Sequence, residues 1–188
     1  MIIDTIKSNF KIILFGFVFL FVGSVGQSFF IGLFNSEIRN ELNISHGEFG
    51  SIYAIATLCS SLLFIWIGKK IDDFKLVHYS MFVIVLLAFS AIFFSYVSGI
   101  IFLFFGIFLL RLSGQGLMSH TSTTSISRYF EKRRGKALSY IWLGMSLGEF
   151  LLPVLIVYLL SFIYWRDLWI QISITIILIL PAISLFTI

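Results

Sequence analysis

Six long apolar segments dominate this sequence and limit the folds that the chain can adopt. They cover residues 10–34, 49–67, 77–96, 100–124, 137–162 and 168–185. At a rise of ~1.5 Å per residue, each could cross most or all of a ~30 Å hydrocarbon core as an α-helix. In lipid only helices and closed barrels satisfy every backbone polar group. The segments therefore predict an all-α membrane protein, with one domain of six transmembrane helices over residues 1–188.

The composition agrees with a membrane protein and excludes a soluble one. Hydrophobic residues make up 59% of the chain and charged residues 12%, too few to cover the surface of a soluble domain. The single cysteine, Cys59, lies in an apolar segment and offers neither a disulfide framework nor a metal cluster. We expect no cofactor. We also expect no nucleic-acid partner, because the basic residues are spread over the connections between helices.

The basic residues fall in alternate connections, and this pattern predicts the orientation of the chain. The N-terminal segment and the loops after the second and fourth spans hold Lys7, Lys11, Lys69, Lys70, Lys75, Arg128, Lys132, Arg133, Arg134 and Lys136. The other loops hold only Arg39 and Arg166. Cytoplasmic loops of membrane proteins are enriched in Lys and Arg. We therefore predict an N-in, C-in, multi-pass protein of the plasma (inner) membrane, in contact with the lipid bilayer.

Two charged residues inside apolar segments are the first candidates for a transport pathway. Arg111 in the fourth segment and Glu149 in the fifth both fall near the middle of the predicted membrane span. Charges at this depth are costly and normally face a bundle interior or a watery cavity. An alternative is that the two residues pair with each other and only hold two helices together.

Helical spacing extends each charge into a polar face, and we predict that both faces point inward. The first face consists of Arg111, Gln115, Ser119 and Ser122, and the second of Ser139, Trp142, Ser146, Glu149 and Pro153.

Other residues within the apolar segments complete the candidates. Gln27 would either bond between helices or line a cavity, and His120 would either relay protons or serve as a structural residue. Gly144 and Gly148 form a small-xxx-small step, which lets another helix approach closely.

The motifs around these residues resemble the N-terminal six-helix half of the major facilitator superfamily. They read Arg111-x-x-Gly114-Gln115-Gly116, then Arg128-Tyr129-Phe130-x-x-Arg133-Arg134-Gly135-x-Ala137, then Gly144-x-x-x-Gly148-x-x-x-x-Pro153, and finally Trp165-Arg166. In addition, the run from Gly68 to Asp72 is similar to the start of the family's loop between helices two and three. The resemblance covers essentially the whole chain.

The resemblance implies a secondary carrier, not an enzyme, that moves a small solute by alternating access. One form of this function is proton-coupled symport of an organic anion. The candidates for the substrate or proton pathway are the polar residues singled out above, Arg111, Gln115, Glu149, Gln27 and His120. The implied gating or loop residues are Gly68, Asp72, Arg128, Arg133, Arg134 and Gly135, and the helix-packing residues are Gly144, Gly148 and Pro153.

Carriers of this family combine two six-helix halves, whereas this sequence supplies one. We therefore expect a truncated or split gene product, or a chain that pairs with a second six-helix bundle, its own copy included. Two alternatives stay open, a non-transporting membrane subunit or scaffold and a truncated inactive fragment of a carrier. A rhomboid-like protease is disfavoured because the sixth segment contains no histidine to act as a base.

Overall fold

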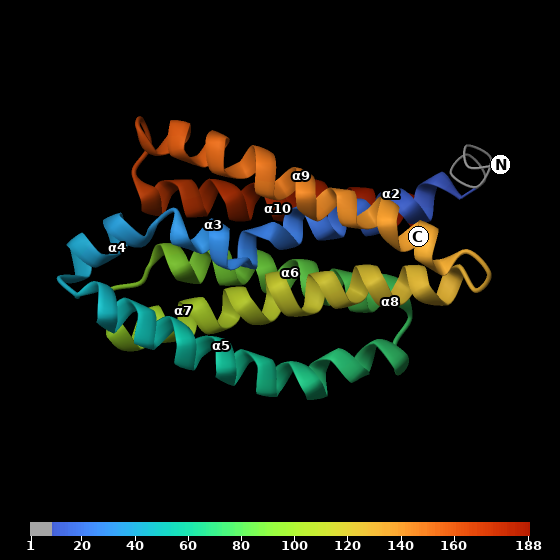
Figure 1. The fold of residues 1–188 in the computed structure, drawn as a ribbon, viewed down its shortest axis with the longest axis horizontal. Coiled ribbons are helices and arrows are strands. Elements are labelled where there is room, and N and C mark those ends of the chain that lie inside the picture. The colour runs from blue at the N-terminus through green and yellow to red at the C-terminus, as the bar shows by residue number, and fades with distance from the viewer. Residues whose placement is uncertain (1–8) are drawn as a thin grey trace.

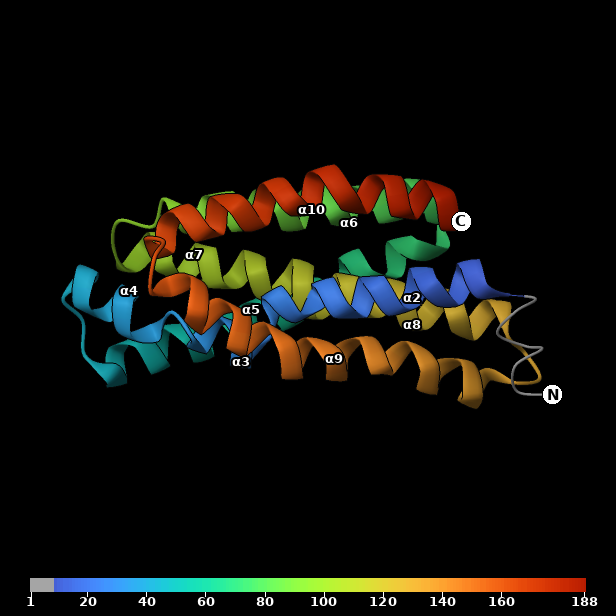
Figure 2. The same ribbon diagram turned by 90° about the horizontal axis from the view of Figure 1, so that it is seen from above.

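The computed structural model describes residues 9–188, and these form a bundle of long helices that lie side by side (Figures 1 and 2). Six helices in this range are long and apolar enough to cross a membrane, namely Phe10–Gly32, His46–Asp72, Leu76–Ser95, Ile100–Tyr129, Arg134–Leu160 and Trp165–Thr187. The predicted all-α, six-helix architecture is confirmed. Lys7 and the other residues before Asn9 lie outside the described residues.

The first span is interrupted in its second half. It consists of α2 (Phe10–Gly23), a 3-10 turn η1 (Ser24–Gly26) and α3 (Ser28–Gly32). The interruption falls at Gln27, whose backbone is extended, with φ −81° and ψ 156°. Such a break leaves backbone carbonyls without their intrahelical donors, so other groups must satisfy them.

The connection after the first span contains a short helix, α4 (Asn35–Leu42), where the sequence predicted a loop. Six of its eight residues are polar and only Ile38 is buried, so the segment resembles a loop in hydropathy. Asn43 ends it in the left-handed conformation, with φ 52°.

The second and third spans form a hairpin of α5 (His46–Lys69), the turn η2 (Lys70–Asp72) and α6 (Leu76–Ser95). A capping box starts α5 earlier than the apolar pattern suggested. The Glu48 amide donates to Ser45 Oγ at 3.2 Å, and the Ser45 amide donates to Glu48 Oε2 at 2.7 Å. On its other side, α6 packs along α10 (Trp165–Thr187), where Ser173 Oγ donates to the Ala88 carbonyl at 2.7 Å.

The fourth span changes geometry in its middle. It runs through α7 (Ile100–Leu110), a π-helical stretch η3 (Arg111–Met118) and α8 (Ser119–Tyr129). This stretch touches the break in the first span. A Cβ at Gly26 would lie 2.3 Å from the Leu110 carbonyl oxygen, and one at Gly114 would lie 2.7 Å from Gly26 Cα. Glycine at both positions is therefore what allows the two distorted segments to meet.

The fifth span, α9 (Arg134–Leu160), and α5 are the least covered helices of the bundle. Only 22% and 17% of their apolar windows are buried, against 56% for the first span and 50% for the fourth. They lie at opposite edges of the view in Figure 1, with the first and fourth spans between them. We call the exposed surface of α9, which includes Ser146 and Glu149, the open face of the bundle.

A clasp of Glu41, Tyr164, Trp165 and Arg166 ties α4 to the start of α10. The Glu41 carboxylate accepts hydrogen bonds from Tyr164 Oη, Trp165 Nε1 and both Nε and Nη2 of Arg166. Arg166 also donates to the carbonyls of Ser95 and Val97 after α6. Partial burial alone would raise the pKa of the Glu41 carboxyl. The hydrogen bonds from Arg166, Tyr164 and Trp165 outweigh it, so this pKa lies below its usual value of 4.5.

Candidate functional site

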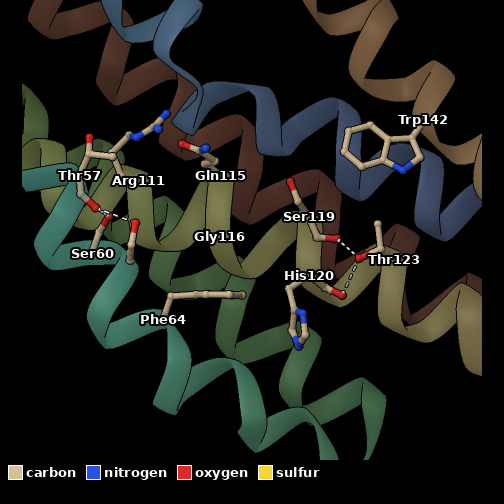
Figure 3. Close-up of a pocket in the computed structure, with 11 residues that line it drawn as sticks. Thr57, Ser60, Phe64, Arg111, Gln115, Gly116, Ser119, His120, Thr123 and Trp142 are labelled. Atoms are coloured by element: carbon tan, nitrogen blue, oxygen red, sulfur yellow. Dashed lines mark hydrogen bonds between the residues drawn. The ribbon is translucent and has the colours of Figure 1, made fainter. Parts of the chain in front are cut away.

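A pocket of about 340 Å³ opens between α5, the middle of the fourth span and α9 (Figure 3). On one side, α5 contributes Thr57, Ser60 and Phe64 to its wall. The fourth span contributes Arg111, Gln115, Ser119 and His120, and Trp142 reaches the pocket from α9. The wall is therefore rich in hydroxyl and nitrogen donors, although it lies in the middle of apolar helices.

Arg111 is the buried cation of this pocket, with 8% of its surface exposed. Its Nη1 donates to the carbonyl oxygen of Gly26 at 3.2 Å, and its guanidinium carbon lies 5.4 Å from the centre of the Tyr53 ring. Within residues 9–188, Nε has no hydrogen-bond partner. A guanidinium carries five N–H donors, and one of them holds the broken first helix through Gly26.

Further polar atoms are buried around the pocket. Ser119 Oγ has no hydrogen-bond partner among the described residues, and the Tyr53 hydroxyl lies beside those of Ser28 and Thr57. Leaving such a group unbonded costs about 1–3 kcal/mol. Buried polar groups are normally satisfied by protein or by an ordered molecule. This cluster is therefore suited to hold water or a polar solute.

His120 connects the pocket to the end of α5. Its Nε2 lies 3.2 Å from the Gly68 carbonyl oxygen and its Nδ1 3.3 Å from Thr124 Oγ1. Its ring meets that of Phe64 edge-on, with the ring centres 5.4 Å apart. Asp72, which follows Gly68 in the α5–α6 hairpin, forms an ion pair with Arg128 of α8. Two polar contacts thus tie the α5–α6 hairpin to α8.

The family model of the Major Facilitator Superfamily matches residues 15–188, nearly the whole chain. This chain belongs to the major facilitator superfamily. No curated protein and no solved structure shows a significant match to it. Members of the superfamily are membrane transporters of small molecules, and the chain has the six apolar helices of an integral, multi-pass member.

Arg111, Gln115 and Ser119 of the predicted polar face line the pocket, whereas Ser122 is not among its lining residues. Ser122 is buried and donates to the Gly16 carbonyl at 2.7 Å. The prediction assumed regular α-helical spacing. The π-helical stretch has more residues per turn, so it changes the register between Arg111 and the residues that follow it, of which Ser119 still lines the pocket.

Glu149 is exposed on the surface of α9, as are Ser139 and Ser146 of the same predicted face. Of the residues predicted on that face, Trp142 reaches the pocket. No ion pair within residues 9–188 joins Arg111 to Glu149. Gln27 is half-buried at the break in the first span.

The loop residues of the superfamily motifs occupy different surroundings. The Gly68 carbonyl oxygen lies 3.2 Å from His120 Nε2, as described above, and Asp72 contacts Arg128. Arg134 Nε donates to the Ser127 carbonyl at 3.1 Å, and Arg133 precedes the first residue of α9. A Cβ at Gly135 would meet no atom within 4 Å, so this glycine is not required by packing.

The small residues of α9 lie against the first span. A Cβ at Gly144 would lie 2.2 Å from the Phe17 carbonyl oxygen, and one at Gly148 would lie 2.3 Å from Ser24 Oγ. Neither position has room for a larger side chain, so these glycines bring α9 into backbone contact with α2. Pro153 follows inside α9.

The contribution of α5 was missed in the sequence. Tyr53, Thr57, Ser60 and Phe64 follow one another at helical spacing and face the fourth span. A row of hydroxyl and aromatic side chains at i, i+4, i+7 and i+11 in an apolar segment was the available signal.

Proposed function

We propose that this chain is half of a secondary active carrier and that the pocket beside Arg111 binds a small organic anion such as a carboxylate. The observation that carries the proposal is the buried guanidinium, whose Nε has no partner among the described residues and which lines the pocket. Charge-assisted hydrogen bonds to a carboxylate are about twice as strong as neutral ones. A carboxylate would also accept a hydrogen bond from Ser119 Oγ.

The open face of the bundle supports a second six-helix bundle as the partner. Glu149 and Ser146 are exposed on α9, and a charge exposed to lipid near mid-membrane is costly. A second bundle would cover this face and complete the cavity beside Trp142, whether it is a C-terminal half or another copy of the chain. Alternating access would then consist of one bundle rocking against the other.

Glu149 is our candidate for coupling to protons, in a symport mechanism. Closing the second bundle over α9 would remove its exposed carboxylate from water, and opening that face would return it to water. Coupling would therefore follow from how the face of α9 is covered.

The distribution of charge supports an N-in, C-in orientation in the plasma (inner) membrane. The described chain begins and ends at one end of the bundle, together with the α5–α6 and α8–α9 connections (Figures 1 and 2). These connections and the helix ends that adjoin them contain Lys69, Lys70, Lys75, Arg128, Lys132, Arg133 and Arg134. We refer to this as the basic end, and we propose that it faces the cytoplasm.

Uptake of radiolabelled carboxylates into membrane vesicles tests this function. We expect Arg111→Gln and Ser119→Ala each to reduce uptake, the arginine change by at least about tenfold because it removes a charge-assisted donor. Arg39→Gln removes a cation from α4, away from the pocket, and should leave uptake unchanged. Ser119→Ala keeps the Arg111–Gly26 bond, so its loss of uptake could not be attributed to a misfolded first span. If uptake persists in both pocket variants, the alternative of a non-transporting subunit is favoured instead.

A further inference from the structure

A second pocket, of about 430 Å³, lies at the hairpin between α5 and α6. It is lined by Ile67, Lys70, Phe74, His78, Tyr79 and Phe82, and it shares none of these residues with the pocket beside Arg111. The hairpin belongs to the basic end of the bundle, where the apolar spans begin and end. A ligand of this pocket would therefore sit where membrane and water meet.

The wall of this pocket continues into an apolar strip on the outer surface of α6. Phe74 and Phe82 are 58% and 48% exposed. From Phe82 the exposed large residues follow at helical spacing as Val85, Phe89 and Ile92. The opposite side of α6 packs on α7 and α10. An extended hydrocarbon chain could leave the pocket along this strip without crossing any charged group of α6.

The floor of the pocket offers no free polar group. Tyr79 is 3% exposed and its hydroxyl donates to the Ile67 carbonyl at 3.1 Å, so its ring forms an apolar base. The interior therefore suits hydrocarbon, and the polar groups lie at its mouth.

The mouth of the pocket carries an excess of positive charge. Lys70 pairs with Asp73, 2.9 Å from Nζ to Oδ2, and both side chains remain more than half exposed. Asp72 is paired with Arg128. Lys69, Lys75 and the imidazole of His78 are exposed beside these pairs. An anion at the mouth could thus accept hydrogen bonds from Lys70 and His78 while Lys75 adds long-range attraction.

We propose that this hairpin pocket binds an anionic phospholipid. Its phosphate would lie between Lys70 and His78, and one acyl chain would pass between Phe74 and Phe82 onto the strip along α6. Basic pockets between transmembrane helices near the cytoplasmic surface are suited to anionic headgroups. A zwitterionic lipid brings its own cation to the same mouth, so it gains less from the excess positive charge.

Native mass spectrometry of the purified protein after incubation with equal amounts of phosphatidylglycerol and phosphatidylcholine tests this inference. We expect the unmodified protein to retain phosphatidylglycerol in preference. The double variant Lys70→Gln/His78→Gln should reduce that preference by about fivefold or more, the effect of losing a basic contact to the headgroup. Phe82→Ser should reduce retention of the lipid while leaving the headgroup contacts in place.

Lys132→Gln is the matched control, since it removes an exposed lysine of the basic end outside the pocket. It should retain the preference of the unmodified protein. Equal retention of the two lipids, an unchanged preference in the double variant, or an equal loss in Lys132→Gln would overturn the proposal. So would displacement of the lipid by a dimer of the chain in which Phe74 and Phe82 are covered. The altered side chains are exposed, and an unchanged midpoint of thermal unfolding verifies that each variant is folded.

Discussion

The Nη1 atom of Arg111 donates a hydrogen bond of 3.2 Å to the carbonyl oxygen of Gly26. This bond joins the π-helical stretch of the fourth span to the break in the first. Each irregularity exposes backbone groups that a regular helix would satisfy, and the arginine supplies a donor at the point where the two meet. A cation held in this way is already positioned at the pocket before any ligand arrives.

The close contact of the two spans predicts a large effect of a single methyl group at Gly26. Gly26→Ala places a Cβ 2.3 Å from the Leu110 carbonyl oxygen, so the first and fourth spans must separate. We expect the free energy of unfolding to fall by about 1–3 kcal/mol. Chemical denaturation in detergent measures this change. Gly135→Ala is the control, because its Cβ would meet no atom within 4 Å and helical propensity favours alanine. Equal destabilisation of both variants would refute the packing argument.

The clasp around Glu41 predicts a stability that depends on pH. The pKa of this carboxyl is lower in the folded protein than its ordinary value of 4.5. The clasp therefore stabilises the fold above that ordinary value, and its contribution is lost as the pH falls through the folded pKa.

We expect Glu41→Gln to lower the free energy of unfolding near neutral pH by about 1 kcal/mol, a small amount because a partly exposed charge pair is screened by solvent. The difference from the unmodified protein should shrink as the pH drops below 4.5. Thermal unfolding as a function of pH measures it. Glu37→Gln makes the same charge change on the same helix, outside the clasp, and should show no comparable difference at neutral pH. A difference for Glu41→Gln that stays constant down to low pH would contradict the assignment.

The ion pair of Asp72 and Arg128 predicts a weak coupling. Their side chains are 60% and 52% exposed, so water screens the attraction. A double-mutant cycle with Asp72→Asn and Arg128→Gln should give a coupling free energy of unfolding of about 0–1 kcal/mol. A much larger coupling would mean that the contact is shielded from water, for instance by a second bundle.

The positions of the six helices could be predicted from the sequence because lipid requires long apolar segments, and those segments are visible without any knowledge of packing. The short helix α4 could not, since six of its eight residues are polar and only Ile38 is buried, so it reads as a loop in hydropathy. The N-in, C-in orientation stays a prediction that rests on the loop charges.

The candidate site was predictable only in part. Arg111 and Gln115 were found because a charge and an amide inside an apolar segment are conspicuous. The π-helical stretch was not, because its larger number of residues per turn leaves no mark on hydropathy. Ser122, predicted beside Arg111, Gln115 and Ser119, is buried but does not line the pocket. Which helix faces the arginine depends on tertiary packing, so the neighbours Tyr53 and Thr57 were missed.

Trp142 provides the most direct test of the central claim, that the pocket beside Arg111 binds a small anion. Its ring lines the pocket opposite α5, so a bound solute should change its fluorescence. Titrating the purified protein with small carboxylates should give a saturable change that is lost in Trp142→Phe. The apparent affinity should weaken by at least about tenfold in Arg111→Gln, the loss of a charge-assisted donor. A saturable signal of unchanged affinity in Arg111→Gln, or no saturable signal in the unmodified protein, would contradict the account.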